Sequence, residues 1–596
     1  MDSSRLILVF VISFVLLILS QKFLFKPDNT QAPAKPEAQQ TQPAATTPAT
    51  PAPGAQVATA TAGGPAKTAQ APAVPLTQAT AESETVVEND LYKITFSNKG
   101  GLVKSWILKK YKDENGKPLE LVHQQAASEW GYPLSLWTWD QGLRDKLNSA
   151  LYVTSESQTG AGSQPGVIQV AKSPATINFD YSDGNVTVHK SFTFDHSYVV
   201  KVETSVTQNG GYVTALPAWP AGFGDLTVPA TYAGQRIDYS TGDSLKRLST
   251  DKKGKDISGG RVMPGPFEWG GAVDQYFGAI FLPDQPKQAV LAQLRNAIKI
   301  PKDPKKPDGD KMDETVLGAA VGYLNAPVSE RLFVGPKAMD VLGAIHANGL
   351  SGQANAGSDL KGTVDFGIFA FIGRPLFAWL KWTQQHWISN WGWAIIFITV
   401  VINLALLPLR ITSMKSALKM QKLAPQMKAI QEKYKKFKLN DPRRQEQNAE
   451  IGALYKQHGV NPAGGCLPLL IQMPFLFAFY TMLSSAIELR QASWLWLNDL
   501  AGPDRYFLIP ILIVISMMML QRMTPQAGIS AEQQRMMNLM MPLMIGFMSW
   551  SVASGLGLYW VTSQLVGIAQ QSVMNRTELG KEIRAIALKR AAKQKK

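Results

Sequence analysis

Polar side chains interrupt several long apolar stretches of this chain, and they are the groups whose chemistry a function could use. Gln472 lies inside the apolar stretch 461–483. Thr399, Asn403 and Arg410 follow one another at i, i+4 and i+11, which places them on one face of a helix. At membrane depth such side chains face a bundle interior or a wet cavity, because lipid offers them no hydrogen bonds. The spacing therefore predicts an inward-facing polar surface inside a membrane bundle.

Groups that would make or break covalent bonds are not recognisable in the sequence. We find no nucleophile elbow, nucleotide-binding loop or metal-ligand spacing. Cys466 is the only cysteine, which excludes an intrachain disulfide and a cysteine-based metal cluster. A membrane-bound enzyme is therefore disfavoured, and no cofactor is expected. A secondary transporter or channel is the alternative function. It would want acidic groups within the spans or an internal repeat, and we detect neither.

Six apolar spans must position these polar groups. The first lies at 6–19 in a predicted anchor, and the others are predicted at 393–409, 461–483, 507–520, 536–552 and 556–573. An even number of spans puts both ends of the chain on the same side of the membrane. The formal net charge of +15 gathers in the loop after the second span and in the tail. Basic segments stay inside by the positive-inside rule, so parity and charge agree on a cytoplasmic loop and tail.

The stretch 86–350 reads as a separate domain on the outer side. Short alternating runs at 92–96, 186–194 and 198–206 are separated by turn signals, which is typical of an antiparallel β-sandwich. The Pro-, Ala- and Thr-rich segment 27–85 before it is expected to be a disordered linker. Aromatic and basic residues mix at 360–387, which favours an interfacial amphipathic helix. A soluble helix that packs on the sandwich is the other interpretation.

The basic loop 411–458 is predicted to be a cytoplasmic helical hairpin, bent or restarted at Pro425. One apolar series in it has heptad spacing: Met420, Leu423, Met427, Ile430, Tyr434 and Phe437. The tail 575–596 is rich in lysine and arginine, which would suit ribosomal RNA or anionic lipid. The sequence alone leaves these two partners open, and it also leaves open whether the hairpin is only a connection.

With these pieces in place, the chain resembles the YidC/Oxa family of membrane protein insertases, in its Gram-negative form. The matching motifs are Asn-Pro-Ala-Gly-Gly-Cys-Leu-Pro-Leu-Leu-Ile-Gln-Met-Pro at 461–474, Glu-Leu-Arg-Gln-Ala at 488–492, Ile-Pro-Ile-Leu at 509–512 and Ser-Gly-Leu-Gly-Leu-Tyr at 554–559. The membrane half, predicted at 388–574, carries the specific motifs. The β-domain matches mainly by its length and position.

The resemblance implies a multi-domain bacterial inner-membrane protein with a periplasmic β-sandwich and a six-span helical core. Its function would be to insert nascent membrane proteins and help them fold, through a hydrophilic groove open to cytoplasm and lipid. The implied partners are the client proteins, membrane lipids, the Sec translocon (SecYEG and SecDF) and the ribosome, with no DNA. The ribosome would bind through the tail and the hairpin. Such a groove lowers the cost of moving polar groups into hydrocarbon without ATP.

The resemblance also assigns residues to the groove and to a surface along which clients slide. The predicted groove residues are Thr399, Asn403, Arg410, Gln472, Asn538 and Gln564. The predicted sliding surface contains Met473, Phe475, Met540, Met544, Tyr559 and Trp560. Hydrogen bonds between helices would equally explain the amides at 472, 538 and 564. Ordinary packing or an interfacial position would explain the methionines and aromatics.

One position departs from the family pattern. The family usually places an arginine five residues before the proline that ends the second span, and this chain has Asn403 there. Two explanations are open. A hydrated groove lined by amides could suffice, with Arg410 anchored at the headgroups, or Arg410 could reach back and supply the charge. We favour the first, because a long arginine side chain normally extends towards water.

Overall fold

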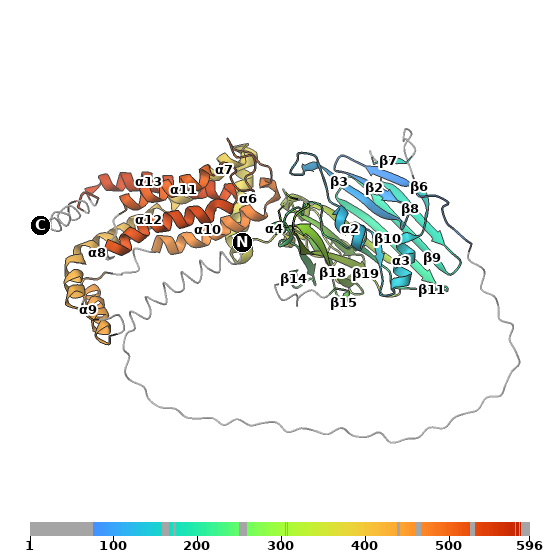
Figure 1. Ribbon diagram of the computed structural model, residues 1–596, viewed down its shortest axis with the longest axis horizontal. Coiled ribbons are helices and arrows are strands. Elements are labelled where there is room, and N and C mark those ends of the chain that lie inside the picture. Colours follow the sequence, from blue (N-terminus) through green and yellow to red (C-terminus); the bar gives the residue numbers. More distant parts are fainter. Residues whose placement is uncertain are drawn as a thin grey trace, which may run out of the picture.

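The computed structural model describes residues 75–585, except 158–165, 171–173, 250–258, 304–305, 307, 435, 438–440, 461–466, 525–530, 579 and 583–584. It has two parts, a β-domain and a helical region, which lie end to end along the molecule (Figure 1). The predicted anchor 1–26 and the linker up to residue 74 lie outside the described residues. Thr77 already pairs with Ser182, so the β-domain begins before the predicted boundary at 86.

The strands described for the β-domain form three sheets, in which the pairing is antiparallel apart from β1 with β7. The first sheet has the order β4 (Pro118–Glu120), β3 (Leu102–Lys112), β2 (Tyr92–Ser97), β1 (Glu84–Glu88) and β7 (Val167–Gln169). The third has the order β15 (Arg261–Pro264), β18 (Val290–Pro301), β19 (Lys311–Gly322), β12 (Leu216–Trp219) and β5 (Ser135–Trp137). The strands of the second, largest sheet alternate along the chain with those of the other two sheets.

The largest sheet contains ten strands. Its order is β14 (Leu245–Ser249), β13 (Arg236–Ser240), β16 (Trp269–Val273), β17 (Phe277–Pro283), β20 (Val328–Pro336), β10 (Val199–Gln208), β9 (Val186–Phe194), β8 (Ala175–Ser182) and β6 (Val153–Ser157), with β11 (Gly211–Tyr212) on β10. The predicted strands at 186–194 and 198–206 are confirmed as β9 and β10, paired antiparallel from Val200–Phe194 to Gln208–Val186. Their alternation buries every second side chain, as the sequence pattern predicts.

Short helices connect the strands and close the domain. They are α2 (Gln124–Trp130), α3 (Gln141–Ser149), α4 (Pro229–Tyr232), α5 (Met339–Gly343), η1 (Leu360–Thr363) and η2 (Gly367–Phe369). Asp140 caps α3, because its carboxylate accepts a hydrogen bond from the Leu143 amide at 3.0 Å. One contiguous apolar core extends from the sandwich through Phe366 and Leu376 into the helical region at Ile395 and Phe479. The two parts therefore share packed interior.

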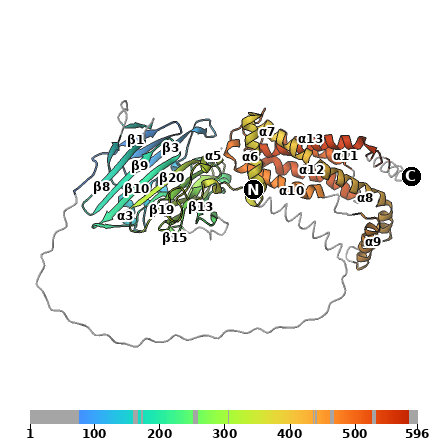
Figure 2. The ribbon, with the colours of Figure 1, turned by 180° about the vertical axis from the view of Figure 1, so that it is seen from behind.

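The helical region begins with α6 and runs away from the β-domain (Figure 2). Its elements are α6 (Ala370–His386), α7 (Trp391–Ala405), α8 (Leu407–Lys433), α9 (Arg443–Gln457), α10 (Leu467–Ser485), η4 (Ile487–Leu489), α11 (Leu508–Met523), α12 (Ala531–Met548), η5 (Ser549–Ser551) and α13 (Ser554–Arg576). α6 buries Leu376, Phe377 and Leu380 and exposes Phe371 and Trp382. This two-sided character suits either interpretation of the predicted helix at 360–387.

The hairpin predicted at 411–458 consists of α8 and α9. Leu423 and Met427 of the heptad series pack against Ile451 and Tyr455. Pro425 lies inside α8, which continues to Lys433, so the helix does not restart there. By length and hydropathy, no single described helix qualifies as a membrane span, although α7 passes together with the part of α8 up to Met420.

Candidate functional site

The predicted span 393–409 is broken, and the break shapes the candidate site. Asn390 starts α7, since its Oδ1 accepts hydrogen bonds from the amides of Gly392 and Trp393 at 3.0 and 3.3 Å. The helix ends at Ala405, and α8 starts at Leu407 after a bend of 48°. Pro408 explains the break, because it lacks an N–H and is favoured in the first turn of a new helix. Asn403 and Arg410 therefore lie on different helices, contrary to the prediction of one continuous face.

The bend nevertheless brings the two side chains together. Arg410 Nη2 donates a hydrogen bond to Asn403 Oδ1 at 3.3 Å. Ser563 Oγ on α13 donates to the same oxygen at 3.2 Å, and Gln472 Nε2 on α10 donates to Ser563 Oγ at 3.1 Å. Gln570 Nε2 donates to the backbone oxygen of Asn403 at 3.0 Å. We call these five residues the polar centre, which joins α7, α8, α10 and α13.

Asn403 is the hub of the polar centre and is only 4% exposed. Its Nδ2 donates to the backbone oxygen of Thr399 at 2.8 Å, so both ends of the amide are used. Space for the guanidinium comes from Gly567, where an added Cβ would lie 2.8 Å from Arg410 Nη1. Arg410 is half-buried and points back to the amide, which is the geometry that the second explanation of the Asn403 departure requires.

Three other predicted groove residues have different surroundings. Thr399 is buried, and its hydroxyl donates within its own helix to the Ile395 oxygen at 2.6 Å. Gln564 is buried on α13, and Asn538 is half-buried on α12. The hydrogen bonds of the polar centre therefore join three of the six predicted residues, Asn403, Arg410 and Gln472.

Sequence reasoning missed Ser563 and Gln570. They are seven residues apart on α13, a spacing that keeps two side chains on one helical face. Gln564, the residue predicted on this helix, lies one residue away from that face. A search for polar pairs at i and i+7 within the last span would have found the two residues.

Three buried glutamines of the helical region carry an amide oxygen that receives no hydrogen bond from the described residues. Gln564 Oε1, Gln570 Oε1 and Gln521 Oε1 on α11 are buried and lack a hydrogen-bond partner among the described residues. A buried acceptor without a donor costs free energy unless water or a ligand supplies the donor. Water or an N–H or O–H group of a ligand would satisfy these acceptors.

The predicted sliding residues divide into exposed and buried ones. Met540 and Met544 are 60% and 55% exposed on α12. Met473 is buried, and Tyr559 is 2% exposed and stacks on Phe479 with ring centroids 4.1 Å apart, so neither lies on an open surface. Phe475 and Trp560 are half-buried. The exposed apolar face is instead made by α12 with residues that include Leu539, Leu543 and Phe547.

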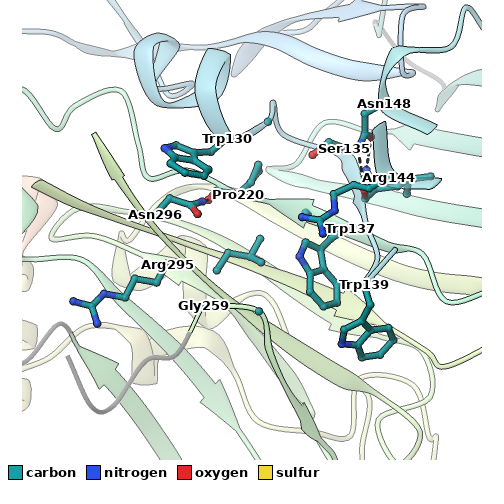
Figure 3. A pocket seen from close by; sticks show the side chains of 15 residues that line it. Trp130, Ser135, Trp137, Trp139, Arg144, Asn148, Pro220, Gly259, Arg295 and Asn296 are labelled. Carbon is teal, nitrogen blue, oxygen red and sulfur yellow. Dashed lines mark hydrogen bonds between the residues drawn. The ribbon is translucent and has the colours of Figure 1, made fainter. Parts of the chain in front are cut away.

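The β-domain has a pocket of about 470 Å³ (Figure 3). Trp130, Trp137 and Trp139 line it, with Arg144 beside Trp137. The side chain of Asn148 is already engaged by both backbone groups of Leu136. Three indole rings and the guanidinium groups of Arg144 and Arg295 are the side chains available to a ligand, and the lining holds no paired acid and base for catalysis.

Comparison with known proteins places both parts in one family. Residues 84–380 match the family described as YidC periplasmic domain, and residues 382–581 match the one described as 60Kd inner membrane protein. The membrane protein insertase YidC of Geobacter metallireducens is 33% identical over 581 residues, which cover 96% of this chain and 98% of that protein. The one from Syntrophus aciditrophicus is 30% identical and covers 97% and 100%. A crystal structure of an active YidC insertase is 19% identical, covers 84% and 95%, and has a TM-score of 0.33.

Proposed function

The chain belongs to the YidC family of membrane protein insertases, and from that premise we propose that its polar centre receives the polar segments of client proteins during insertion. As a member it is an inner-membrane protein with a periplasmic domain, and its clients are nascent membrane proteins. The observation that carries the proposal is the network from Gln472 through Ser563 and Asn403 to Arg410, beside amide oxygens that have no donor.

The physical basis is the cost of moving polar groups into hydrocarbon. Each peptide group or charge without a partner there costs several kcal/mol. Gln564 and Gln570 present acceptors to such a segment, and Arg410 presents a cation to its carboxylates. Neutral amides accept and release a client more readily than a buried ion pair would, because no strong charge pair must be broken. The exposed α12 face, with its flexible methionines, then suits apolar segments of varied shape.

We further propose that Asn403 and Arg410 act together where the family usually has one arginine. The guanidinium lies 3.3 Å from the amide oxygen, so the positive charge reaches the centre from the start of α8. The bend at Leu406 supports this arrangement, because it turns the first residues of α8 back towards α7. This combines the two explanations that the sequence left open.

The membrane topology is part of the same proposal. The six spans would be the N-terminal anchor, the bent pair α7–α8, and α10, α11, α12 and α13. The β-domain would then lie in the periplasm and α9 in the cytoplasm. Figure 1 supports this assignment, because the β-domain lies at one end of the helical region and α9 lies near the other end. The limits 388–574 of the membrane core and 575–596 of the tail belong to this proposal, whereas the β-domain begins by Thr77 and not at 86.

The proposed partners follow from charge and position. The hairpin 411–458 and the basic tail would approach the ribosome, whose RNA attracts lysine and arginine irrespective of sequence. The Sec translocon would cooperate for clients with large translocated parts, and smaller clients would insert with this protein alone. Help with client folding would use the same apolar α12 face.

The test is complementation in a bacterium depleted of its own insertase. The depleted cells receive the parent chain or one of three variants, Asn403→Leu, Arg410→Ala and Thr412→Ala. Insertion of a small Sec-independent membrane protein is then measured by its accessibility to protease. We expect roughly tenfold less insertion for each of the first two variants, because each breaks a hydrogen bond to a charged group. Thr412 is an exposed residue of α8 whose hydroxyl bonds the Pro408 oxygen, so Thr412→Ala serves as the control.

Each outcome has a defined meaning. If both centre variants insert as well as Thr412→Ala, the polar centre does not receive clients. If Asn403→Leu fails and Arg410→Ala is normal, the amide works alone and the joint role of the two residues is wrong. If the folded parent chain itself does not support insertion, the groove proposal as a whole fails.

A further inference from the structure

The outer end of α10 and the turn after it make several hydrogen bonds with the β-domain. Thr481 Oγ1 lies 2.9 Å from the Phe366 oxygen, and its single O–H is shared between that acceptor and two oxygens of its own helix, those of Phe477 at 3.0 Å and Ala478 at 3.2 Å. Ser485 Oγ donates to the Asp365 oxygen at 2.9 Å. Gln275 Nε2 of the β-domain donates to the Ser484 oxygen at 2.6 Å. Thr481 and Ser485 are four residues apart, so their hydroxyls lie on one face of α10. These contacts come from residues far apart in the sequence.

Ion pairs reinforce this contact at the turn after α10. Lys381 Nζ of α6 lies 2.6 Å from Asp340 Oδ2 in α5 and 3.4 Å from Glu488 Oε1 in η4. Lys381 and Glu488 are largely buried, which limits screening by solvent. Gln491 Nε2 also donates to the Lys112 oxygen of β3 at 2.9 Å. The turn after α10 is thus held by α5, α6 and the first sheet.

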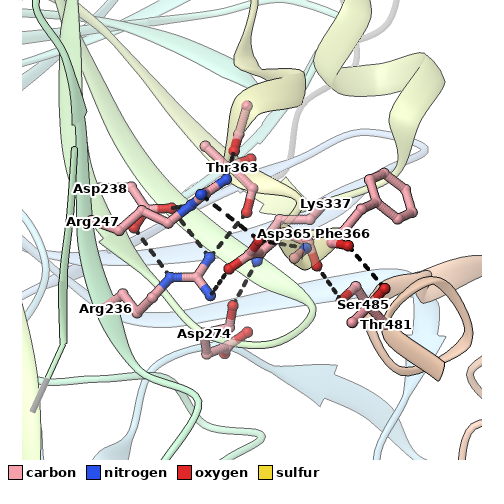
Figure 4. A network of polar contacts seen from close by, with 12 residues as sticks. Arg236, Asp238, Arg247, Asp274, Lys337, Thr363, Asp365, Phe366, Thr481 and Ser485 are labelled. Atoms are coloured by element: carbon pink, nitrogen blue, oxygen red, sulfur yellow. Dashed lines mark hydrogen bonds and ion pairs between the residues drawn. The ribbon is translucent and has the colours of Figure 1, made fainter. Parts of the chain in front are cut away.

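The β-domain segment around Asp365, which accepts these hydrogen bonds, is itself held to the largest sheet (Figure 4). The Asp365 carboxylate lies 3.8 Å from Arg236 Nη1 and 3.7 Å from Arg247 Nη1. Arg236 is paired with the fully buried Asp238 at 3.2 Å and donates to the Thr363 oxygen at 3.1 Å. The carbonyl groups that receive Thr481 and Ser485 are therefore parts of a rigid surface, not of a loose connection.

The backbone approaches α10 closely at this point. Gly367 has a φ of +64°, a conformation that side chains rarely adopt, and a Cβ there would lie 3.1 Å from Thr481 Cγ2. Phe369 stacks on Phe477 with ring centroids 5.9 Å apart and an interplanar angle of 10°. The chain that leaves the β-domain thus packs along the outer half of α10 before α6 begins.

A physical path leads from this contact to the polar centre. Phe479, in the outer half of α10, stacks on Tyr559 of α13 at 4.1 Å. Tyr559 is one helical turn from Ser563, so the two side chains share a face of α13. This path avoids Pro474, where α10 lacks a backbone donor and bends more easily. The outer end of α10 therefore affects Ser563 through ring stacking and helix geometry.

We propose that Thr481 and Ser485 are positioning residues for insertion, which dock α10 on the β-domain and so hold Ser563 in register within the polar centre. This inference rests on the proposed function of the centre and adds a role for the periplasmic domain. The domain acts as a rigid base for the groove. Neither hydroxyl touches a client.

The experiment compares Thr481→Val with Ser485→Ala in one chain against Ser484→Ala. Ser484 is the adjacent residue, and its hydroxyl donates only along its own helix, to the Tyr480 oxygen at 2.7 Å. Its substitution leaves the backbone oxygen that Gln275 binds. Valine keeps the shape of threonine, so the paired variant removes hydrogen bonds with little loss of packing. Insertion is measured in depleted cells with equal amounts of each protein.

A second readout separates positioning from simple destabilisation. Val566→Cys, in a chain with Cys466→Ser, places a thiol on α13 three residues after Ser563 and four before Gln570, and its rate of alkylation reports the environment of the polar centre. We expect the paired variant to insert about three- to tenfold less and the thiol rate to change by a similar factor, because two neutral hydrogen bonds are lost. Resistance of the folded β-domain to protease should be unchanged, because its own interior is untouched.

The inference is overturned if the paired variant matches Ser484→Ala in insertion and in thiol rate. It is also overturned if insertion falls while the thiol rate stays constant, because the loss then does not pass through the polar centre. If the parent and Ser484→Ala both fail to insert, the proposed function of the centre is wrong and this inference falls with it.

Discussion

The β-domain buries a charged amine at Lys190, whereas the helical region buries a neutral amide at Asn403. Lys190 is fully buried, and its Nζ donates to the oxygens of Gly100, Gly101 and Leu134 at 2.9, 2.7 and 2.7 Å. An ammonium group has three donors, and all three are used. In the helical region, Gln570 bonds Asn403 through its Nε2 while its Oε1 has no donor among the described residues, and Gln564 Oε1 on the same helix also has none.

We call the Lys190 network closed, because all three of its donors are used, and the network of the polar centre open, because some acceptors there have no donor. Three carbonyl oxygens around one ammonium fix the β2–β3 turn to β9 and leave nothing for a ligand. An open network costs some stability but keeps groups available for a partner. Burial lowers the pKa of Lys190 to about 7, which is the cost of placing a cation where only dipoles surround it. The polar centre avoids most of this cost by using amides and a half-buried arginine.

Lys190→Met tests the closed network and should have the largest effect on stability. Three buried carbonyl groups would lose their donor, so we expect a loss of about 3 kcal/mol in the free energy of unfolding of the β-domain. The measurement is pulse proteolysis of the full-length protein in detergent over a urea series. Lys201→Met is the control, since Lys201 is an exposed residue of the adjacent strand paired with Glu203. Equal stability of the two variants would contradict the structural role of Lys190.

The pH dependence of stability tests the protonation of the same residue. The pKa of Lys190 is lowered in the folded protein, so the unfolded chain holds more protons between about pH 7 and pH 10. Stability should therefore rise with pH across this window, by up to about 1.4 kcal/mol per unit from this group. The rise should be absent from Lys190→Met when the two urea series are compared at each pH. An identical slope in both proteins would show that Lys190 keeps an ordinary pKa.

Gln564→Leu tests the open network and should have the smallest effect on stability. The substitution removes an acceptor that has no donor, so we expect the free energy of unfolding to change by less than about 1 kcal/mol. Insertion should nevertheless fall several-fold. Gln571→Leu is the matched control, because Gln571 Nε2 bonds Asn575 Oδ1 away from the polar centre. Strong destabilisation by Gln564→Leu would show that its amide is structural and would weaken the comparison.

The alternating pattern of the β-domain was readable from the sequence because burial on one face of a strand leaves a period of two. The same pattern places Lys190 on the inward face, between Val188 and Phe192, where a lysine is unexpected. Its acceptors were not predictable. Gly100, Gly101 and Leu134 are 90, 89 and 56 residues away and meet the amine only when the sheets pack.

The sequence by itself determined the two-part organisation, the β9–β10 pair, the seam of the α8–α9 hairpin and the family, because these depend on local periodicity and contiguous motifs. It also selected Asn403, Arg410 and Gln472. Only the tertiary structure decided that Arg410 bonds Asn403, that Ser563 and Gln570 complete the centre, and that Met473 and Tyr559 are buried. The docking of α10 on the β-domain was likewise decided only by the tertiary structure. Hydrogen bonds between distant segments depend on where helices bend and how they pack, and a linear pattern of residue types does not encode either.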